Sequence, residues 1–276
     1  MTSISRRNLL RAATGLAGSY GVSQLTGCAT SNDARAVSRP TMATGSFTSA
    51  ARGGVQTNWM IARPPGSYPP LRPIIALHGQ GQNADEVMSM GVEKVLADAA
   101  AANLPPVAVV SVDGGTTYWH KRSSGEDAGA MVLNELLPML PSLGLATERV
   151  AFMGWSMGGY GALLLGNRLG AKRTAAICAV SPALFSPPTG KNFPDGAFDD
   201  ASEYAANNVW GPNAVPLVPI RIDCGDSDQF AATTKQYIAQ LKQQPAGSFT
   251  PGGHNHSYWD KQLPDQIRWI IPHLTA

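Results

Sequence analysis

The sequence predicts an α/β protein with a mostly parallel central sheet and helices on both faces of that sheet. Two observations support this fold class. Short, nearly continuous apolar runs recur along the chain, and segments with helical apolar periodicity lie between them. Strands that are apolar throughout are buried on both faces, and their alternation with helices is typical of parallel sheets. A chain of 276 residues can form one such domain with a full core.

The expected strands follow one another at regular intervals. Residues 55–63 alternate between apolar and polar side chains, which indicates an antiparallel strand before the Pro-Pro-Gly turn. The apolar runs then cover residues 73–77, 107–112, 149–153, 175–180 and 220–224, with a short sixth run at 248–251. Ligands of open α/β sheets bind at the carboxyl ends of the strands, so the polar residues there are the candidates for chemistry.

The expected helices lie between these runs, at residues 84–102, 129–140, 157–169, 233–243 and 261–274. Residues 185–216 are rich in Pro, Gly and Asn and poor in strand-forming residues. We therefore expect this segment to be an insertion over the end of the sheet, where it could form a wall of a pocket.

Composition excludes several classes of protein. Hydrophobic residues make up 43% of the chain, too many for a disordered protein. The formal net charge of +2 gives no basic field of the kind that binds nucleic acid. Three cysteines are too few for a disulfide scaffold. Cys178 and Cys224 fall on neighbouring expected strands, and we expect them to be buried free thiols because parallel ladders rarely offer bridging geometry.

The first residues are expected to direct export. Arg6-Arg7 followed by a mildly apolar stretch resembles a bacterial twin-arginine signal, and the stretch is too short to span a bilayer. The string ending at Cys28 resembles a lipobox, which predicts lipidation of that residue. We assign residues 1–35 to the signal and the start of a tether, 36–44 to a linker and 45–276 to the catalytic domain. The expected location is the cell envelope, on a lipid anchor or otherwise secreted.

The string Gly154-Trp155-Ser156-Met157-Gly158 lies between an expected strand and an expected helix. A Gly-x-Ser-x-Gly turn in this context is so tight that its flanking positions need glycine, and it exposes the serine hydroxyl above the sheet. The following helix directs its first N–H groups toward the same place. The sequence therefore predicts that Ser156 is a nucleophile, rather than only the cap of a glycine-rich helix.

The longer string from Gly154 to Leu163, Gly-Trp-Ser-Met-Gly-Gly-Tyr-Gly-Ala-Leu, resembles the α/β-hydrolase esterases of the esterase D type. This group includes S-formylglutathione hydrolases, feruloyl esterases and the antigen 85 mycolyltransferases. The resemblance runs from about residue 44 to the C-terminus. It implies an α/β-hydrolase fold and a Ser-His-Asp mechanism.

The resemblance places the catalytic base just before the last helix, where two histidines compete. Gly-Gly-His followed by Trp259 resembles the feruloyl esterase and antigen 85 pattern and favours His254. The His-Ser-Tyr string resembles the formylglutathione hydrolase pattern and favours His256. We prefer His254 because of its spacing from the two glycines. The pair is not expected to bind a metal, since no third ligand is close in sequence.

The resemblance also places the orienting acid in a Gly-x-x-Asp string at a strand end, which is Asp228. Such an acid holds the imidazole in one tautomer and stabilises the imidazolium. Asp226 is the alternative, while Asp223 is expected within the strand. Ser156, Asp228 and His254 then follow the chain order expected of α/β-hydrolases.

The oxyanion hole of this fold uses the N–H of the residue after the nucleophile, here Met157. By resemblance, the second N–H belongs to Gln80 in the loop after residues 73–77. The loop that carries Tyr118 and Trp119 is expected by resemblance to border the acyl pocket. Ordinary core packing of these two aromatic residues is the equal alternative.

The function predicted from these residues is hydrolysis of carboxylic esters through an acyl-enzyme, with no metal or organic cofactor. The substrate would be a small-molecule, lipid or carbohydrate ester. One alternative is an acyltransferase of the antigen 85 kind, which would use the same residues and a sugar or alcohol acceptor. A second alternative is a non-catalytic envelope-binding protein on a hydrolase scaffold.

Overall fold

The computed structural model of this protein describes residues 37–39, 41–186, 196–211, 214 and 217–276. The expected twin-arginine signal and the expected lipidation site at Cys28 lie outside these residues. The expected insertion at 185–216 is described in part.

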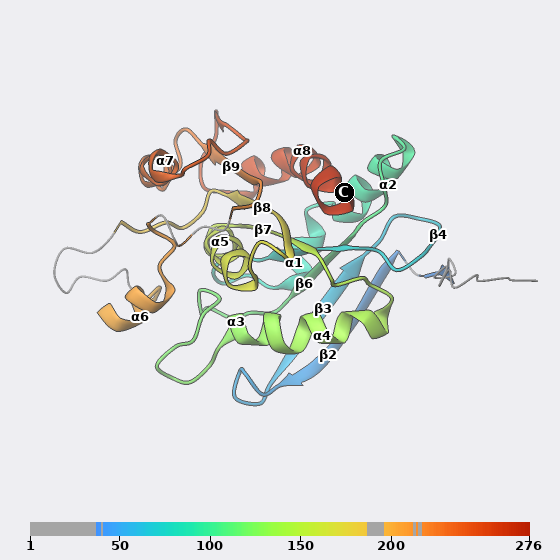
Figure 1. The fold of residues 1–276 in the computed structure, drawn as a ribbon, viewed down its shortest axis with the longest axis horizontal. Helices are drawn as coiled ribbons and strands as arrows, with labels where there is room; N and C mark the ends of the chain where they lie inside the picture. Colours follow the sequence, from blue (N-terminus) through green and yellow to red (C-terminus); the bar gives the residue numbers. More distant parts are fainter. Residues whose placement is uncertain (1–36, 40, 187–195, 212–213, 215–216) are drawn as a thin grey trace, which may run out of the picture. The chain divides into compact units, whose positions relative to one another are not determined.

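An eight-stranded sheet forms the centre of the fold, in the order β10-β9-β8-β7-β5-β6-β3-β2 (Figure 1). Its strands are β2 (Met42–Ser49), β3 (Val55–Ala62), β5 (Pro73–Leu77), β6 (Ala108–Val112), β7 (Val150–Trp155), β8 (Thr174–Val180), β9 (Ile220–Gly225) and β10 (Phe249–Thr250). β2 pairs with β3 and β3 with β6 in antiparallel fashion, whereas the remaining pairs are parallel. This arrangement confirms the predicted mostly parallel sheet. A separate two-stranded sheet joins β1 (Val37–Ser38) to β4 (Ser67–Tyr68).

Helices cover both faces of the sheet. They are α1 (Ala84–Ser89), α2 (Val92–Ala101), α3 (Ala128–Met131), the π-helical turn η1 (Val132–Leu136), α4 (Leu137–Met139), the 3₁₀ turn η2 (Leu140–Leu143), α5 (Met157–Leu169), α6 (Ala201–Asn207), α7 (Ala231–Gln240) and α8 (His256–Thr275). Alternate residues of one strand enter different cores: Ile75 packs with α3, α4 and α5, whereas Ile74 packs with α1, α2 and α8. The central strands are buried throughout because both faces are covered.

Three elements differ from the sequence expectation. β2 begins at Met42, inside the segment assigned to a linker, so the ordered fold starts before residue 45. The helix expected over 84–102 is two helices, because Gly91 between them has a left-handed φ of 88°. α8 begins at His256 rather than at residue 261, because the Asn255 side chain caps it by accepting from the Tyr258 N–H.

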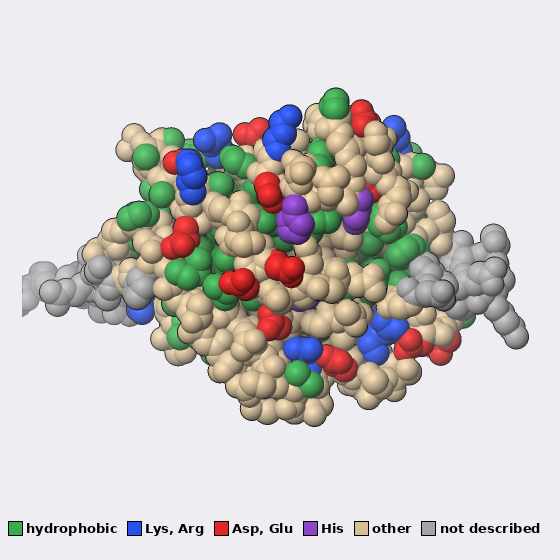
Figure 2. Space-filling model, turned by 180° about the vertical axis from the view of Figure 1, so that it is seen from behind, with side chains coloured by type: hydrophobic (Ala, Val, Ile, Leu, Met, Phe, Trp, Pro, Cys, Tyr) green, Lys and Arg blue, Asp and Glu red, His purple; other side chains and the backbone are tan. Residues whose placement is uncertain are grey.

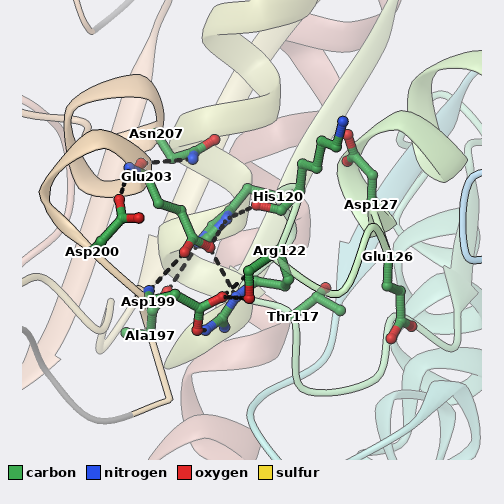
Figure 3. Close-up of polar contacts among 12 residues, drawn as sticks. Thr117, His120, Arg122, Glu126, Asp127, Ala197, Asp199, Asp200, Glu203 and Asn207 are labelled. Carbon is green, nitrogen blue, oxygen red and sulfur yellow. Dashed lines mark hydrogen bonds and ion pairs between the residues drawn. The ribbon is translucent and has the colours of Figure 1, made fainter.

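The described part of the insertion carries α6, which the loop over residues 117–127 holds by polar contacts (Figure 3). Arg122 Nε lies 2.8 Å from Glu203 Oε1 of α6, and the Nε2–H of His120 donates to Ala197 O over 3.0 Å. The His120 ring also stacks on Phe198, which in turn packs edge-on against Phe185. The insertion is thus tied to the loop after β6, at the carboxyl edge of the sheet.

On the face that Figure 2 views, positive and negative side chains are interspersed. No helix within the described ranges is long and apolar enough to cross a membrane. Cys178 and Cys224 are both buried and free, as expected.

Candidate active site

Ser156 lies in the turn between β7 and α5, with φ 55° and ψ −123°, a backbone conformation that non-glycine residues rarely adopt. The neighbouring glycines make this turn possible. A Cβ on Gly158 would come within 1.9 Å of the Leu77 carbonyl oxygen, and one on Gly154 within 2.4 Å of the Gly158 oxygen. The backbones of β5, β7 and α5 therefore meet at a distance that a side chain would prevent.

His254 connects the serine to a buried carboxylate. Its Nε2 lies 2.8 Å from Ser156 Oγ, and its Nδ1 lies 2.9 Å from Asp228 Oδ2. The three side chains follow three different strands, β7, β9 and β10, whose carboxyl ends meet at one edge of the sheet. The structure therefore brings together the three residues that the sequence singled out, from positions 26 and 98 residues apart along the chain.

Electrostatics keep Asp228 ionised. Its side chain is 0% exposed, and burial alone raises the pKa of the carboxyl. Hydrogen bonds from His254 and from the Phe230 N–H, which lies 2.8 Å from Oδ1, outweigh burial and hold that pKa below its ordinary value. An ionised Asp228 accepts the Nδ1–H of His254, which leaves the Nε2 lone pair directed at Ser156 Oγ. This tautomer can remove a proton from the hydroxyl.

The alternative residues lie elsewhere. His256 contacts Gln82 and Asp260 rather than the serine. Asp226 accepts from the Ser227 hydroxyl. Asp223 belongs to β9, as expected, and pairs with Arg221.

Gln80, in the loop after β5, lines the same cavity as Ser156. The carbonyl of Gly79 is held from two sides, by Nδ1 of the buried His78 at 2.7 Å and by the Gln82 N–H at 3.2 Å. Because a trans peptide directs its N–H opposite its carbonyl, these contacts orient the N–H of Gln80. Met157 is the first residue of α5, so no carbonyl of the helix accepts its N–H.

A cavity of about 430 Å³ opens at Ser156 and His254. The other side chains that line it are mostly aromatic or amide-bearing: Gln80, Gln82, Tyr118, Phe185, Gln229, Phe230 and Trp259, together with Gly79. The sequence analysis named Gln80 and Tyr118 in this set and expected the segment that begins at Phe185 to form a pocket wall. It missed the other side chains as pocket residues, namely Gln82, Gln229, Phe230 and Trp259. The position of Phe230, two residues after the orienting acid, is the one signal that could have identified it.

Trp119 corrects the sequence expectation, because it does not line this cavity. It is 0% exposed and fills the core under the loop. Its ring lies 5.0 Å from that of His78, and a Cβ on Gly161 of α5 would come within 2.4 Å of it. Neighbouring residues of a loop point in different directions, so Tyr118 faces the cavity while Trp119 faces α5.

Two kinds of comparison relate the chain to known proteins. The family model described as "Putative esterase" matches residues 56–270, which is most of the chain. The match includes the nucleophile turn, the strand end with Asp228 and the loop with His254.

Solved structures with the same fold include FphF, a fluorophosphonate-binding serine hydrolase of Staphylococcus aureus, with 17% identity over 83% of this chain and 98% of that one, at a TM-score of 0.67. A ferulic acid esterase from Anaeromyces mucronatus, solved with ferulic acid, is 14% identical over 90% and 95% of the two chains, at 0.66. MPT51 of Mycobacterium tuberculosis is 14% identical over 83% and 99%, at 0.61. At these identities the likeness establishes the α/β-hydrolase fold.

Proposed function

Because this chain belongs to the Esterase family of serine carboxylic-ester hydrolases, we propose that Ser156, His254 and Asp228 are its catalytic triad. The observation that carries the proposal is the position of His254, with Nε2 at 2.8 Å from Ser156 Oγ and Nδ1 at 2.9 Å from Asp228. Both distances are those of good hydrogen bonds.

The proposed reaction has two steps. Ser156 Oγ attacks the ester carbonyl carbon while His254 Nε2 takes the hydroxyl proton. The negative oxygen of the tetrahedral intermediate accepts from the N–H groups of Met157 and Gln80, and the imidazolium then protonates the departing alcohol. In the second step water, deprotonated by His254, releases the acid from the acyl-enzyme.

The cavity suggests the class of acyl group. Four aromatic rings and three glutamine side chains line an open cavity of about 430 Å³. Its size and its rings suit a short or aromatic acyl group better than a long unbranched chain. The structural neighbour from Anaeromyces binds ferulic acid, an aromatic acid. We therefore propose that a small-molecule ester with a compact acyl group is the substrate.

Initial rates on p-nitrophenyl esters from acetyl to palmitoyl test the proposal. Ser156→Ala should lower kcat by about 10⁶-fold, as loss of a serine nucleophile does elsewhere. Asp228→Asn should lower it by about 10⁴-fold with the fold intact, because the imidazole loses its orienting acceptor. Rates should decline from short to long acyl chains.

Contrary outcomes would identify the alternatives. Hydrolysis by Ser156→Ala at the wild-type rate would refute the triad. Product that carries the acyl group on an added sugar or alcohol, in preference to free acid, would favour the acyltransferase. A folded protein that neither hydrolyses esters nor reacts at Ser156 with a fluorophosphonate would favour the non-catalytic scaffold.

We further propose, from the sequence of the first residues, that the protein is exported and lipid-anchored on Cys28. Expression of the full chain in a bacterium with twin-arginine export should place activity in the detergent-soluble membrane fraction. Cys28→Ser should move the activity to the soluble exported fraction. Activity that stays in the cytosol in both cases would contradict the proposal.

A further inference from the structure

The Gln82 side chain connects the two segments that supply the proposed oxyanion hole. Its Oε1 accepts from the Gly79 N–H at 2.9 Å and from the indole Nε1–H of Trp155 at 3.0 Å. Gly79 directly precedes Gln80 in the loop after β5, and Trp155 directly precedes Ser156. One amide oxygen thus fixes the loop against the nucleophile turn.

The orientation of this amide follows from its partners. A backbone N–H and an indole N–H can only donate, so the atom that faces both must be the oxygen. The Gln82 NH₂ group then faces His256, with Nε2 of the amide 2.6 Å from Nε2 of the ring. That ring nitrogen must accept, so the proton of a neutral His256 resides on Nδ1.

We propose that Gln82 is a positioning residue for the oxyanion hole and that neutral His256 holds its amide in the working orientation. This inference rests on the proposed function, because it concerns the same site. It gives a role to the histidine that lies close to the triad in sequence but does not contact Ser156.

Protonation of His256 conflicts with this arrangement. An imidazolium would direct its Nε2–H at the Gln82 NH₂ group, and two donors cannot share a hydrogen bond. Rotation of the amide would satisfy the imidazolium but would turn the NH₂ group toward Gly79 and Trp155, whose N–H groups would then lose their acceptor. A charged His256 and a fixed oxyanion loop therefore exclude each other.

His256 lies where protons from the solvent can reach its ring. Its side chain is 44% exposed, and Asp260 of the same helix lies 3.6 Å from Nδ1. The ring of Trp259 lies 5.2 Å away. On the facing segment, the carboxylate of Glu86 accepts from the Asn83 N–H at the start of α1, and Gln82 itself is uncharged.

Kinetics of three variants of the full chain test the proposal. Gln82→Met has a side chain of similar length without the amide and should lower kcat about 10- to 100-fold, the cost of a misplaced catalytic group, with KM changed much less. His256→Gln offers an oxygen acceptor to Gln82 and should retain kcat at pH 8. His256→Leu offers none and should lose activity as Gln82→Met does. Gln56→Met, at an exposed position of β3, is the matched control and should behave as the wild type.

The pH dependence of kcat/KM separates positioning from mere structural support. In a plot of log kcat/KM against pH, one inhibitory proton gives a slope of one on the acid side. In the wild type, a proton on His254 and a proton on His256 each oppose catalysis, so this slope should exceed one. His256→Gln should restore a slope of one. Gln82→Glu keeps both acceptor contacts and accommodates the imidazolium, so its slope should also be one. A slope of one in the wild type that these changes leave unaltered would overturn the proposal, as would wild-type kcat in folded Gln82→Met.

A spectroscopic measurement distinguishes failure of this inference from failure of the proposed function. ¹⁵N spectra of histidine-labelled wild-type protein at pH 8 should show His256 protonated at Nδ1, and the His256 signals should change in Gln82→Met. If wild-type protein has no Ser156-dependent esterase activity, the proposed function fails, whereas the spectra still report the contact. A His256 protonated at Nε2 would overturn the inference even in an active enzyme.

Discussion

The two ring nitrogens of His78 have fixed and opposite roles. Nδ1 lies 2.7 Å from the Gly79 carbonyl oxygen and donates to it, while Nε2 accepts from the Gly114 N–H at 2.9 Å. The side chain is completely buried, and burial lowers the pKa of its imidazole. A second proton would face the Gly114 N–H, so this histidine supports the oxyanion loop only when it is neutral.

Stability should therefore fall in acid because of His78. The unfolded chain binds a proton near the ordinary histidine pKa of about 6.5, whereas the folded chain binds it only at lower pH. The stabilisation is complete above about pH 6.5 and is lost as pH falls toward the folded pKa, by at most about 1.4 kcal/mol per pH unit.

Denaturant unfolding between pH 7.5 and pH 5 measures this loss. The decline should be shallower in His78→Asn than in the wild type, although the variant is less stable at pH 7.5. Equal declines in wild type and His78→Asn would contradict the prediction.

At this scale the turn motif singled out Ser156, and the family resemblance pointed to His254 and Asp228. The structure places the three side chains within hydrogen-bonding distance of one another, which a shared edge of parallel strand ends makes possible. The sequence left Tyr118 and Trp119 undecided between pocket and core, since the direction of each side chain in the loop after β6 depends on φ values of 53° at Tyr118 and 58° at Trp119. No local sequence pattern predicts a positive φ at these two residues. The contact between Gln82 and His256 was equally hidden, because it joins residues 174 positions apart.

Among the elements, α5 depends most directly on small residues. It packs on β5, β7 and β8, and its glycines face other parts of the chain. A Cβ on Gly161 would lie 2.4 Å from the ring of Trp119, which is buried on all sides and cannot move away. The close approach of this helix to the loop after β6 thus requires glycine at that position.

Gly161→Ala should destabilise the protein by about 1–3 kcal/mol, the usual cost of overpacking, even though alanine favours helices. Gly166→Ala in the same helix is the matched control. Its Cβ would meet Cδ1 and Cγ1 of Ile177, at 2.5 and 2.8 Å, and the Thr174 methyl at 3.4 Å. Rotation of the Ile177 side chain relieves part of this contact, whereas the Trp119 ring cannot move, so Gly166→Ala should be less destabilising than Gly161→Ala. Equilibrium unfolding of both variants measures the difference, and equal effects would contradict the argument.

Elements with strong apolar patterns were predicted well, and elements defined by tertiary contacts were not. The bounds of β5 and α5 match the expectation, because a buried strand and a glycine-rich helix start can both be recognised from the local sequence. β2 was missed because its small residues suit a tether as well as a strand. The structure supplies the reason for one of them, since Gly45 lies directly under the ring of Trp59 in β3.

Across the whole molecule, the candidate site exists only when the sheet is complete. Ser156 follows β7 in the middle of the sheet, and His254 follows β10 at its edge. The alternation of strands and helices predicted this parallel architecture, and with it the edge where the polar residues gather. The pairing of β2 and the contacts of α6 could not be predicted from the sequence. Both elements pack on surfaces that form only when the rest of the domain has folded.

The turn at Ser156 also sets two properties of the molecule against each other. A side chain held at a φ of 55° and a ψ of −123° costs about 1–3 kcal/mol, which the packing of β5, β7 and α5 must offset. Relaxing that backbone would strengthen the fold and withdraw the hydroxyl from the cavity. The most durable sequence for this architecture is thus not the most reactive one, and adaptation toward heat tolerance has to find its gains away from the nucleophile.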